Sequence, residues 1–491
     1  MGNTSRGRLT FTVEVDAPED LAVDAARADA LLTVRARPAG EARDGPGDEK
    51  AGHGPRHAEV LIMDRSQSMA ASGKLDEAKK AVSAAIDTLR DGTLLGIVAG
   101  DHEATVIYPP PGRPLAPVDQ HVRQHAKHQV AAQVAQGGTR IGRWLTLARD
   151  LFDTSTGSDT VCHAVLYTDG KNEHETPEQL ANAVRGCADR FTCDARGLGE
   201  HWHRTAIRTV TEGLHGSAAA VLDIPDLTED FVRLMQDAQQ LVIPRMYLAL
   251  SLTDRFDLGF VRQTRPVQVD LTDQRQERGA EIHIPLGAWA AGAHQYHVSV
   301  HFEPESLPLN HRVQAATITL RTEPAAGQAD RPTCTDERVL VVKRRSNKAF
   351  AIPVSANLTR VEAERELRFA MQDCADAHER GDSALADAKL RQALALAEQL
   401  GDTRRLRLLH AMAQDGPDGK PVVRTGVSNG QIQQIGLDAT HTGPVPDDPV
   451  DADTGPRRDT GVCPNCQGPL VAPDAKFCEP CGARIAPEGA G

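Results

Sequence analysis

The sequence lacks any apolar run approaching the roughly 20 residues that a membrane-spanning helix requires. Its first ten residues are polar and contain no hydrophobic segment of the kind found in a secretory signal. The chain begins with Met-Gly, but Arg6 stands where an acylation signal needs Ser or Thr. These absences predict a cytoplasmic protein without a membrane span.

The chain also lacks an excess of basic residues, because 55 Lys and Arg stand against 68 Asp and Glu, for a net charge of −13. A negative chain repels phosphate backbones unless a local basic patch offsets the charge, and the sequence shows no such patch. We therefore expect no nucleic-acid partner. The sequence also lacks complete forms of two enzyme motifs, the phosphate-binding loop and the nucleophile elbow. Residues 72–75 lack the first glycine and the Ser or Thr of a phosphate-binding loop, and no GxSxG elbow occurs.

One segment carries a clear chemical signal. Residues 60–63 form an apolar run that ends at Asp64, and two hydroxyl side chains follow at alternate positions, Ser66 and Ser68. A hard cation such as Mg²⁺ prefers an octahedron of oxygen ligands at about 2.0–2.1 Å. Alternate residues in a tight loop can direct three oxygens to one point, so this DxSxS motif predicts a metal site at the end of a buried strand.

Two later segments supply further oxygen ligands. Thr139 follows two glycines and precedes a helical pattern, and Asp169 follows a second apolar strand over residues 161–168. Because open α/β sheets place their ligands at the carboxyl edge, we expect these side chains to meet the DxSxS loop. The alternative is a serine-rich turn that only caps a helix. The agreement of three separate segments favours the metal site.

The five residues, in this order and spacing, resemble the metal-ion-dependent adhesion site of von Willebrand factor A (VWA) domains over about residues 57–240. The resemblance implies a doubly wound, Rossmann-like α/β domain. It also implies a Mg²⁺, Mn²⁺ or Ca²⁺ ion, with Ser66, Ser68 and Thr139 as direct ligands and both aspartates acting mostly through water. In such sites a carboxylate of a partner protein fills the last coordination position.

The rest of the chain predicts further domains. Alternating strands and helices over residues 57–240 indicate a mostly parallel sheet covered on both faces. Period-two patterns over residues 241–346 predict a β-sandwich, and we expect strands within residues 1–40 to complete it. Helical patterns over residues 357–413 predict a small bundle. Residues 414–461, rich in Gly, Pro, Asp and Thr, are expected to be a flexible linker.

The C-terminal segment, residues 462–486, contains two CxxC pairs, formed by Cys463, Cys466, Cys478 and Cys481. Four thiolates can hold Zn²⁺ tetrahedrally at about 2.3 Å, and a segment this short needs the metal as its core. The pattern resembles the short zinc ribbons of bacterial regulatory proteins, which implies a structural site. A redox dithiol is a weaker alternative, because four cysteines leave no open position on the metal. Nucleic-acid binding is also weaker, because the segment contains few Lys or Arg.

Sequence segments such as residues 168–176 and 193–199 resemble those of an actinobacterial group of VWA proteins. Members of that group are associated with phosphothreonine-signalling proteins and with stress or tellurium-resistance operons, which implies a signalling or stress-response context. We expect a non-enzymatic scaffold or adaptor that binds an acidic residue of a partner protein through the metal site. Two alternatives are a subunit of a MoxR-like AAA+ ATPase machine and a metal-dependent hydrolase that uses Asp64 or Asp169 as its base.

Overall fold

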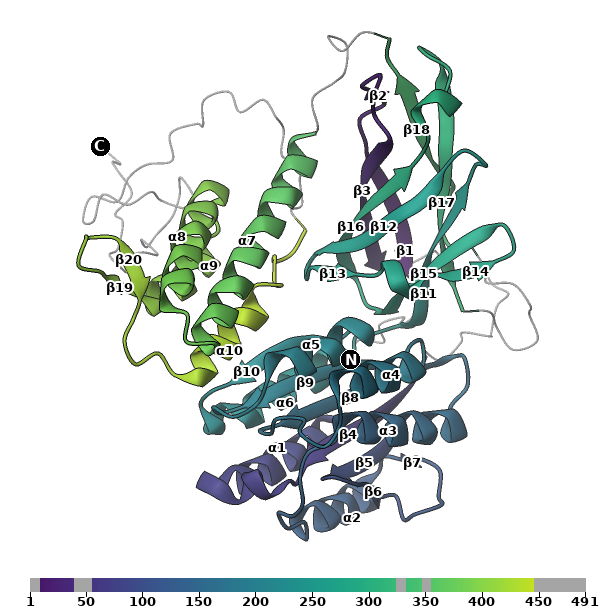
Figure 1. The fold of residues 1–491 in the computed structure, drawn as a ribbon. Coiled ribbons are helices and arrows are strands. Elements are labelled where there is room, and N and C mark those ends of the chain that lie inside the picture. Colours follow the sequence, from purple (N-terminus) through teal and green to yellow (C-terminus); the bar gives the residue numbers. More distant parts are fainter. Residues whose placement is uncertain (1–8, 39–54, 324–332, 347–354, 446–491) are drawn as a thin grey trace, which may run out of the picture. The chain divides into compact units, whose positions relative to one another are not determined.

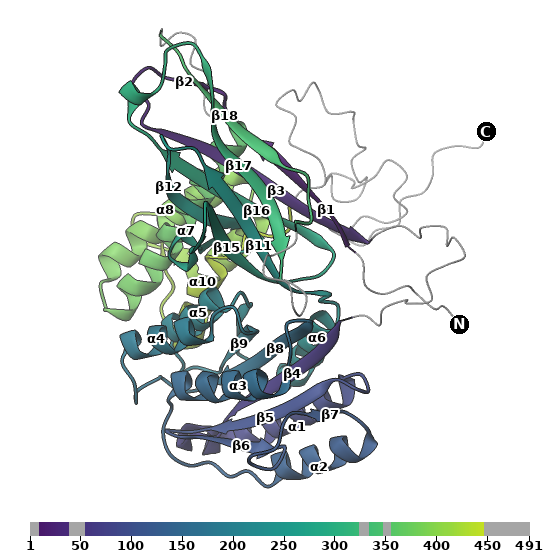
Figure 2. The ribbon, with the colours of Figure 1, turned by 90° about the vertical axis from the view of Figure 1, so that its right-hand side faces the viewer.

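The computed structural model of the protein describes residues 9–38, 55–323, 333–346 and 355–445. They form an α/β domain, two further β-sheets and a helical region, all within one compact unit (Figures 1 and 2). The predicted zinc ligands, and the part of the predicted linker beyond residue 445, lie outside the described residues, so the zinc site stays a prediction. No helix in the described ranges is both long enough and apolar enough to cross a membrane.

The α/β domain is built on a seven-stranded sheet in the order β10-β9-β8-β4-β5-β6, with β7 beside β5. The strands are β4 (Arg56–Asp64), β5 (Leu94–Gly100), β6 (Ala104–Tyr108), β7 (Ala116–Pro117), β8 (Thr160–Thr168), β9 (Thr192–Leu198) and β10 (Ala218–Val221). The strands from β10 to β5 are parallel. Their apolar runs are continuous because both faces are covered: Val60 and Ile62 enter one core, while Leu61 and Met63 enter the other.

Helices cover both faces of this sheet (Figures 1 and 2). One core contains side chains of α3 (Ile141–Ser155), α4 (Pro177–Cys187) and α5 (Arg204–Gly213). The other contains side chains of α1 (Lys74–Thr88), α2 (Gln120–Ala131) and α6 (Leu227–Ala238). Two 3₁₀ helices, η1 (Gln67–Gly73) and η2 (Ile224–Asp226), precede α1 and α6. This doubly covered sheet is the architecture expected from the alternating pattern.

The two further sheets, mostly antiparallel, share a third hydrophobic core. The five-stranded sheet has the order β1-β3-β16-β12-β13, and the six-stranded sheet has the order β14-β15-β11-β17-β18-β2. Leu32 and Val298 from the first sheet pack in one cluster with Leu248 and Ile318 from the second. Because β3 lies between β1 and β16, the N-terminal strands belong to this part, and the α/β domain interrupts it in the chain.

The strands of these two sheets have the following bounds: β1 (Leu9–Asp16), β2 (Asp20–Leu21), β3 (Arg27–Pro38), β11 (Ile243–Leu252), β12 (Asp257–Arg265), β13 (Val269–Asp270), β14 (Gln276–Arg278), β15 (Glu281–Trp289), β16 (Gly292–His301), β17 (Arg312–Thr322) and β18 (Arg338–Arg344). Two 3₁₀ helices, η3 (Thr272–Gln274) and η4 (Pro304–Ser306), lie in connections between them.

The helical region comprises α7 (Ala356–Glu379), α8 (Ser383–Leu400) and α9 (Thr403–Met412), followed by a hairpin of β19 (Ala413–Asp415) and β20 (Pro421–Val423) and by α10 (Asn429–Asp438). The prediction of a flexible linker from residue 414 is therefore wrong up to residue 445. Ser428 and Gln431 form a capping box that starts α10, and Ile432 and Ile435 enter the helical core. The helix is short and rich in Gly and Gln, so its apolar face was not apparent from composition.

Helix α10 joins the helical region to the α/β domain. Glu200, in the loop after β9, accepts hydrogen bonds from Gly430 N and from Ser428 Oγ, the latter at 2.9 Å. Gln434 Oε1 accepts a hydrogen bond of 3.2 Å from the backbone N–H of Ala220 in β10. The helix therefore covers the last strand of the sheet, whose unpaired edge would otherwise be open.

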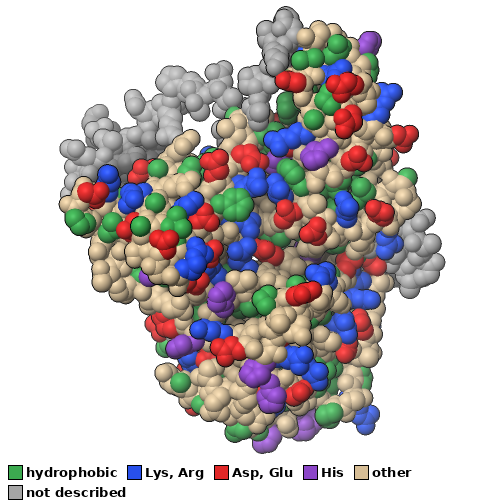
Figure 3. All heavy atoms as spheres, in the orientation of Figure 1, with side chains coloured by type: hydrophobic (Ala, Val, Ile, Leu, Met, Phe, Trp, Pro, Cys, Tyr) green, Lys and Arg blue, Asp and Glu red, His purple; other side chains and the backbone are tan. Residues whose placement is uncertain are grey.

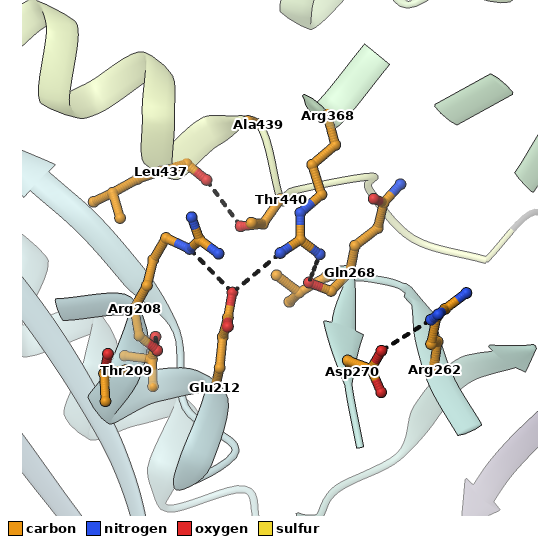
Figure 4. Close-up of polar contacts among 12 residues, drawn as sticks. Arg208, Thr209, Glu212, Arg262, Gln268, Asp270, Arg368, Leu437, Ala439 and Thr440 are labelled. Atoms are coloured by element: carbon orange, nitrogen blue, oxygen red, sulfur yellow. Dashed lines mark hydrogen bonds and ion pairs between the residues drawn. The ribbon is translucent and has the colours of Figure 1, made fainter. Parts of the chain in front are cut away.

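Arginine side chains connect the α/β domain, the two further sheets and the helical region. Figure 4 shows Arg368 of α7 reaching Glu212 of α5 at 3.4 Å and the Gln268 carbonyl oxygen at 2.8 Å. Arg208 donates to the same Glu212 carboxylate at 3.1 Å. Since each guanidinium group offers several donors in a fixed plane, one side chain can hold two elements at once. These contacts fix α7 against both the α/β domain and the strands.

A buried ion triad lies toward the amino ends of the parallel strands. His163 Nδ1 is 2.8 Å from Glu59 Oε2, and His163 Nε2 is 2.9 Å from Asp194 Oδ2. Glu59 and His163 are directly paired across β4 and β8. Although burial alone would lower the pKa of His163, the two carboxylates raise it to about 10. His163 is therefore positively charged at neutral pH, with a carboxylate at each ring nitrogen.

This triad predicts a pH-dependent contribution to stability. Because the folded-state pKa of His163 lies above the unfolded value, its contribution is complete below about pH 6.5 and is lost as the pH rises through about 10. Urea unfolding of wild type and His163→Gln should show a difference in unfolding free energy of at least ~1 kcal/mol at pH 6 that shrinks by pH 10. His128→Gln, on the exposed side of α2, serves as the control. A difference that does not change with pH would contradict a charged His163.

Candidate metal site

Two buried carboxylates lie at the carboxyl ends of neighbouring parallel strands. Asp64 is the last residue of β4, and Asp169 follows the last residue of β8; both are 0% exposed. Met63 is paired with Tyr167, so the next residues, Asp64 and Thr168, also face each other. Thr168 Oγ1 donates a hydrogen bond of 2.5 Å to Asp64 Oδ2. The strand register therefore brings the two predicted acids to one edge of the sheet.

The serine loop closes over these carboxylates. The backbone N–H of Ser66 donates to Asp64 Oδ1 at 2.6 Å. The hydroxyl oxygens of Ser66 and Ser68 are 3.0 Å apart, and Ser68 Oγ donates to Asp169 Oδ1 at 2.6 Å. Both serine hydroxyls thus lie between the two acids, as the DxSxS spacing predicted.

Arg65 anchors the serine loop from its other side. The Arg65 guanidinium donates to Asp101 Oδ2 at 3.0 Å and to Gln133 Oε1 at 2.9 Å. Its backbone carbonyl oxygen accepts a hydrogen bond of 2.7 Å from Gln136 N, in the segment that leads to Thr139. The loop conformation is therefore fixed by contacts outside the carboxylate cluster.

Thr139 is held against the Asp169 loop by both backbone and side-chain contacts. Its carbonyl oxygen accepts a hydrogen bond of 3.2 Å from His174 N, and its hydroxyl lies so near Gly170 that a Cβ built there would be 2.3 Å from Thr139 Oγ1. The same loop caps α3, because Asn172 Oδ1 accepts from Ile141 N at 2.9 Å. These contacts place the threonine hydroxyl against the backbone of Gly170, the residue that follows Asp169.

The first of the two glycines before this threonine adopts a backbone conformation that favours glycine. Gly137 has a φ of +68°, and a Cβ built on it would lie 2.3 Å from His102 Nδ1. Its carbonyl oxygen accepts a hydrogen bond of 2.9 Å from Gln67 N, inside the DxSxS loop. A larger residue would therefore strain the backbone and separate two loops that supply predicted ligands.

Two carboxylates and one ammonium lie together at this edge of the sheet. Burial, with a smaller contribution from the neighbouring Asp169, raises the pKa of Asp64 to about 6 against the lowering effect of the hydrogen bonds from Thr168 and Ser66. The second carboxylate has a cationic partner, because Lys74 Nζ is 2.6 Å from Asp169 Oδ2. A divalent cation would stabilise both carboxylates in the ionised form.

The spacing of the two serine hydroxyls suits a small divalent cation. Ligands at adjacent corners of an octahedron with arms of about 2.0–2.1 Å are about 2.9 Å apart, close to the 3.0 Å between Ser66 Oγ and Ser68 Oγ. Among the described residues, no group of three or more His, Cys, Asp or Glu could hold a metal. The candidate site differs from such groups because it combines two carboxylates with three hydroxyls, a set that suits hard cations rather than zinc.

Two residues of this cluster were missed in the sequence. Thr168 belongs to the apolar strand pattern, and only its register opposite Asp64 makes it the donor to that acid. Lys74 lies in a segment whose only local pattern is an incomplete phosphate-loop motif. Its distance of ten residues from Asp64 gives no local signal, and only the fold brings it to Asp169.

Comparisons with known proteins agree with this geometry. Residues 59–220 match the family model of the von Willebrand factor type A domain. The chain contains a VWA domain. A solved structure described as von Willebrand factor type A, from Catenulispora acidiphila, is 28% identical, with a TM-score of 0.79 over 91% of this chain and 99% of that chain. The similarity therefore extends beyond the VWA domain to the added sheets and helices.

Two further relatives are more distant. The ArnB paralog VWA2 from Sulfolobus acidocaldarius shares the fold with a TM-score of 0.54 at 14% identity, over 89% of this chain and 99% of that chain. The uncharacterized protein sll0103 of Synechocystis sp. is 27% identical over 277 residues, which are 55% of this chain and 62% of that protein. The match thus spans less than two thirds of the Synechocystis protein.

The packing of Gly170 predicts an effect on metal affinity in the VWA domain. Gly170→Ala changes none of the five predicted metal residues but forces Thr139 Oγ1 to move, because the added Cβ would lie 2.3 Å from it. We expect Mn²⁺ affinity, measured by calorimetry, to fall by roughly 10- to 100-fold, as for other changes that misplace a ligand. Gly157→Ala, where the contact is 3.1 Å from an aspartate side chain on an exposed loop, is the control. Equal affinity in wild type and Gly170→Ala would exclude Thr139 as a ligand.

Proposed function

We propose that this protein binds partner proteins through a divalent cation, Mg²⁺, Mn²⁺ or Ca²⁺, held at the carboxyl edge of the VWA sheet. Ser66, Ser68 and Thr139 would bind the ion directly, while Asp64 and Asp169 would act mostly through water. The bound ion supplies a positive charge that attracts an Asp or Glu side chain of the partner. The single observation that carries the proposal is the spacing of the serine hydroxyls between two buried acids.

A protein partner suits the charge of this surface better than nucleic acid does. On the face drawn in Figure 3, Lys and Arg side chains are interspersed with Asp and Glu and form no continuous basic field. VWA domains in general mediate protein interactions. The signalling or stress-response context is part of the proposal and rests on the sequence resemblance alone.

We further propose that binding, and not catalysis, is the role of the site. Both Asp64 oxygens already accept hydrogen bonds, from Ser66 N and Thr168 Oγ1, and both Asp169 oxygens accept from Ser68 and Lys74. A general base must come within hydrogen-bond reach of the substrate proton, and both carboxylates are fully buried beneath these donors. The carboxylates are instead arranged to orient hydroxyl ligands.

Metal-dependent capture tests the proposal. The chain, immobilised and incubated with extract of its source cells, should retain a set of proteins with Mg²⁺ that EDTA releases. Thr139→Ala should lose the same set, because it removes one ligand oxygen. Thr154→Ala, an exposed threonine on α3 that bonds only its own helix backbone, should retain it.

Quantitative mass spectrometry of the retained proteins gives the outcome. Proteins that depend on Mg²⁺ and on Thr139 together support the proposal. Retention that persists both in EDTA and in Thr139→Ala would show that the ion has no role in partner binding.

A further inference from the structure

A lysine is built into the wall of the candidate metal site. Lys74 is the first residue of α1, and its side chain is 9% exposed. Its ammonium is 2.6 Å from Asp169 Oδ2, while the other Asp169 oxygen accepts from Ser68 Oγ. The ammonium and a candidate ligand hydroxyl therefore share one carboxylate.

The backbone before Lys74 directs the side chain into the site. Ser72 and Gly73 have φ values of 56° and 70°, so the chain turns sharply between η1 and α1. The lysine stem then passes Gly199, at the end of β9, where an added Cβ would lie 3.6 Å from Lys74 Cε. Residues other than glycine rarely adopt a left-handed backbone, so the conformation of Ser72 is an unfavourable one that the surrounding structure maintains. The backbone of the loop therefore fixes the position of the lysine side chain.

A count of charges shows what this lysine does to the site. The carboxylates of Asp64 and Asp169 and the ammonium of Lys74 sum to −1, and a divalent ion brings the total to +1. With a neutral side chain at position 74 the same sums would be −2 and zero. The adjacent Arg65–Asp101 pair adds no net charge.

We propose that Lys74 is a permanent internal cation of the metal site, which weakens binding of the divalent ion and strengthens binding of a carboxylate to the ion-loaded site. The inference rests on the proposed metal-dependent function and deepens it. Repulsion between the ammonium and the ion lowers metal affinity, whereas the residual positive charge of the loaded site attracts an anionic ligand. An ion pair with a purely structural role would not change the two affinities in opposite directions.

Charge-changing variants of the full chain separate these effects. Lys74→Gln removes the charge and keeps a donor, and Lys74→Arg keeps the charge. Lys80→Gln, on the exposed side of the same helix, is the matched control. Mn²⁺ affinity is measured by electron paramagnetic resonance of free Mn²⁺, and carboxylate affinity by relaxation of ¹³C-acetate at saturating Mn²⁺.

The expected result is opposite changes in one variant. Lys74→Gln should bind Mn²⁺ about tenfold more tightly and acetate about tenfold more weakly, while Lys74→Arg and Lys80→Gln stay near wild type. Changes in the same direction, or no change in either affinity, would overturn the proposal. Absence of Mn²⁺ binding by wild type would instead refute the proposed function itself, whatever the variants do.

A measurement on wild type covers the case in which Lys74→Gln does not fold. Amine acetylation followed by mass spectrometry compares the reactivity of Lys74 with that of exposed Lys80, with and without Mn²⁺. A permanent internal cation stays protected in both states. If Mn²⁺ makes Lys74 as reactive as Lys80, the ion displaces the lysine and the proposal is wrong.

Discussion

The site depends on the burial of two carboxylates, Asp64 and Asp169, at the ends of adjacent parallel strands. A buried charge is costly unless donors or an opposite charge surround it. Ser66 N and Thr168 supply the donors for the first acid, and Ser68 and Lys74 supply them for the second. The loops that carry these donors are fixed as a result, and the hydroxyl oxygens of Ser66 and Ser68 lie 3.0 Å apart, a spacing that suits a small cation.

The added parts of the chain contact the VWA domain close to this edge. Gly199 lies beside the Lys74 stem, and its neighbour Glu200 is held by the first turn of α10. Helix α7 is fixed to α5 by Arg204, which pairs with Asp376 and with Glu379. The helical region and the candidate metal site therefore both contact the loop after β9.

Local sequence patterns were sufficient to predict the α/β fold of the VWA domain. They also predicted that the serine loop, the Thr139 loop and the Asp169 loop lie at the same edge of the sheet. Continuous apolar strands indicate a parallel sheet, and parallel strands bring their carboxyl ends to one edge. Lys74 could not be predicted, because its partner lies 95 residues away and no local motif marks the pair. Helix α10 was missed because its few apolar residues enter two different cores, with Leu437 in the VWA domain and Ile432 among the helices.

The most direct test of this account is a crystal structure of the Mn²⁺-soaked protein with anomalous diffraction. The account predicts a peak within about 2.0–2.3 Å of the hydroxyl oxygens of Ser66, Ser68 and Thr139, with the Lys74 ammonium still beside Asp169. A map with no peak between these three hydroxyls, at a Mn²⁺ concentration that occupies other sites in the crystal, would contradict it.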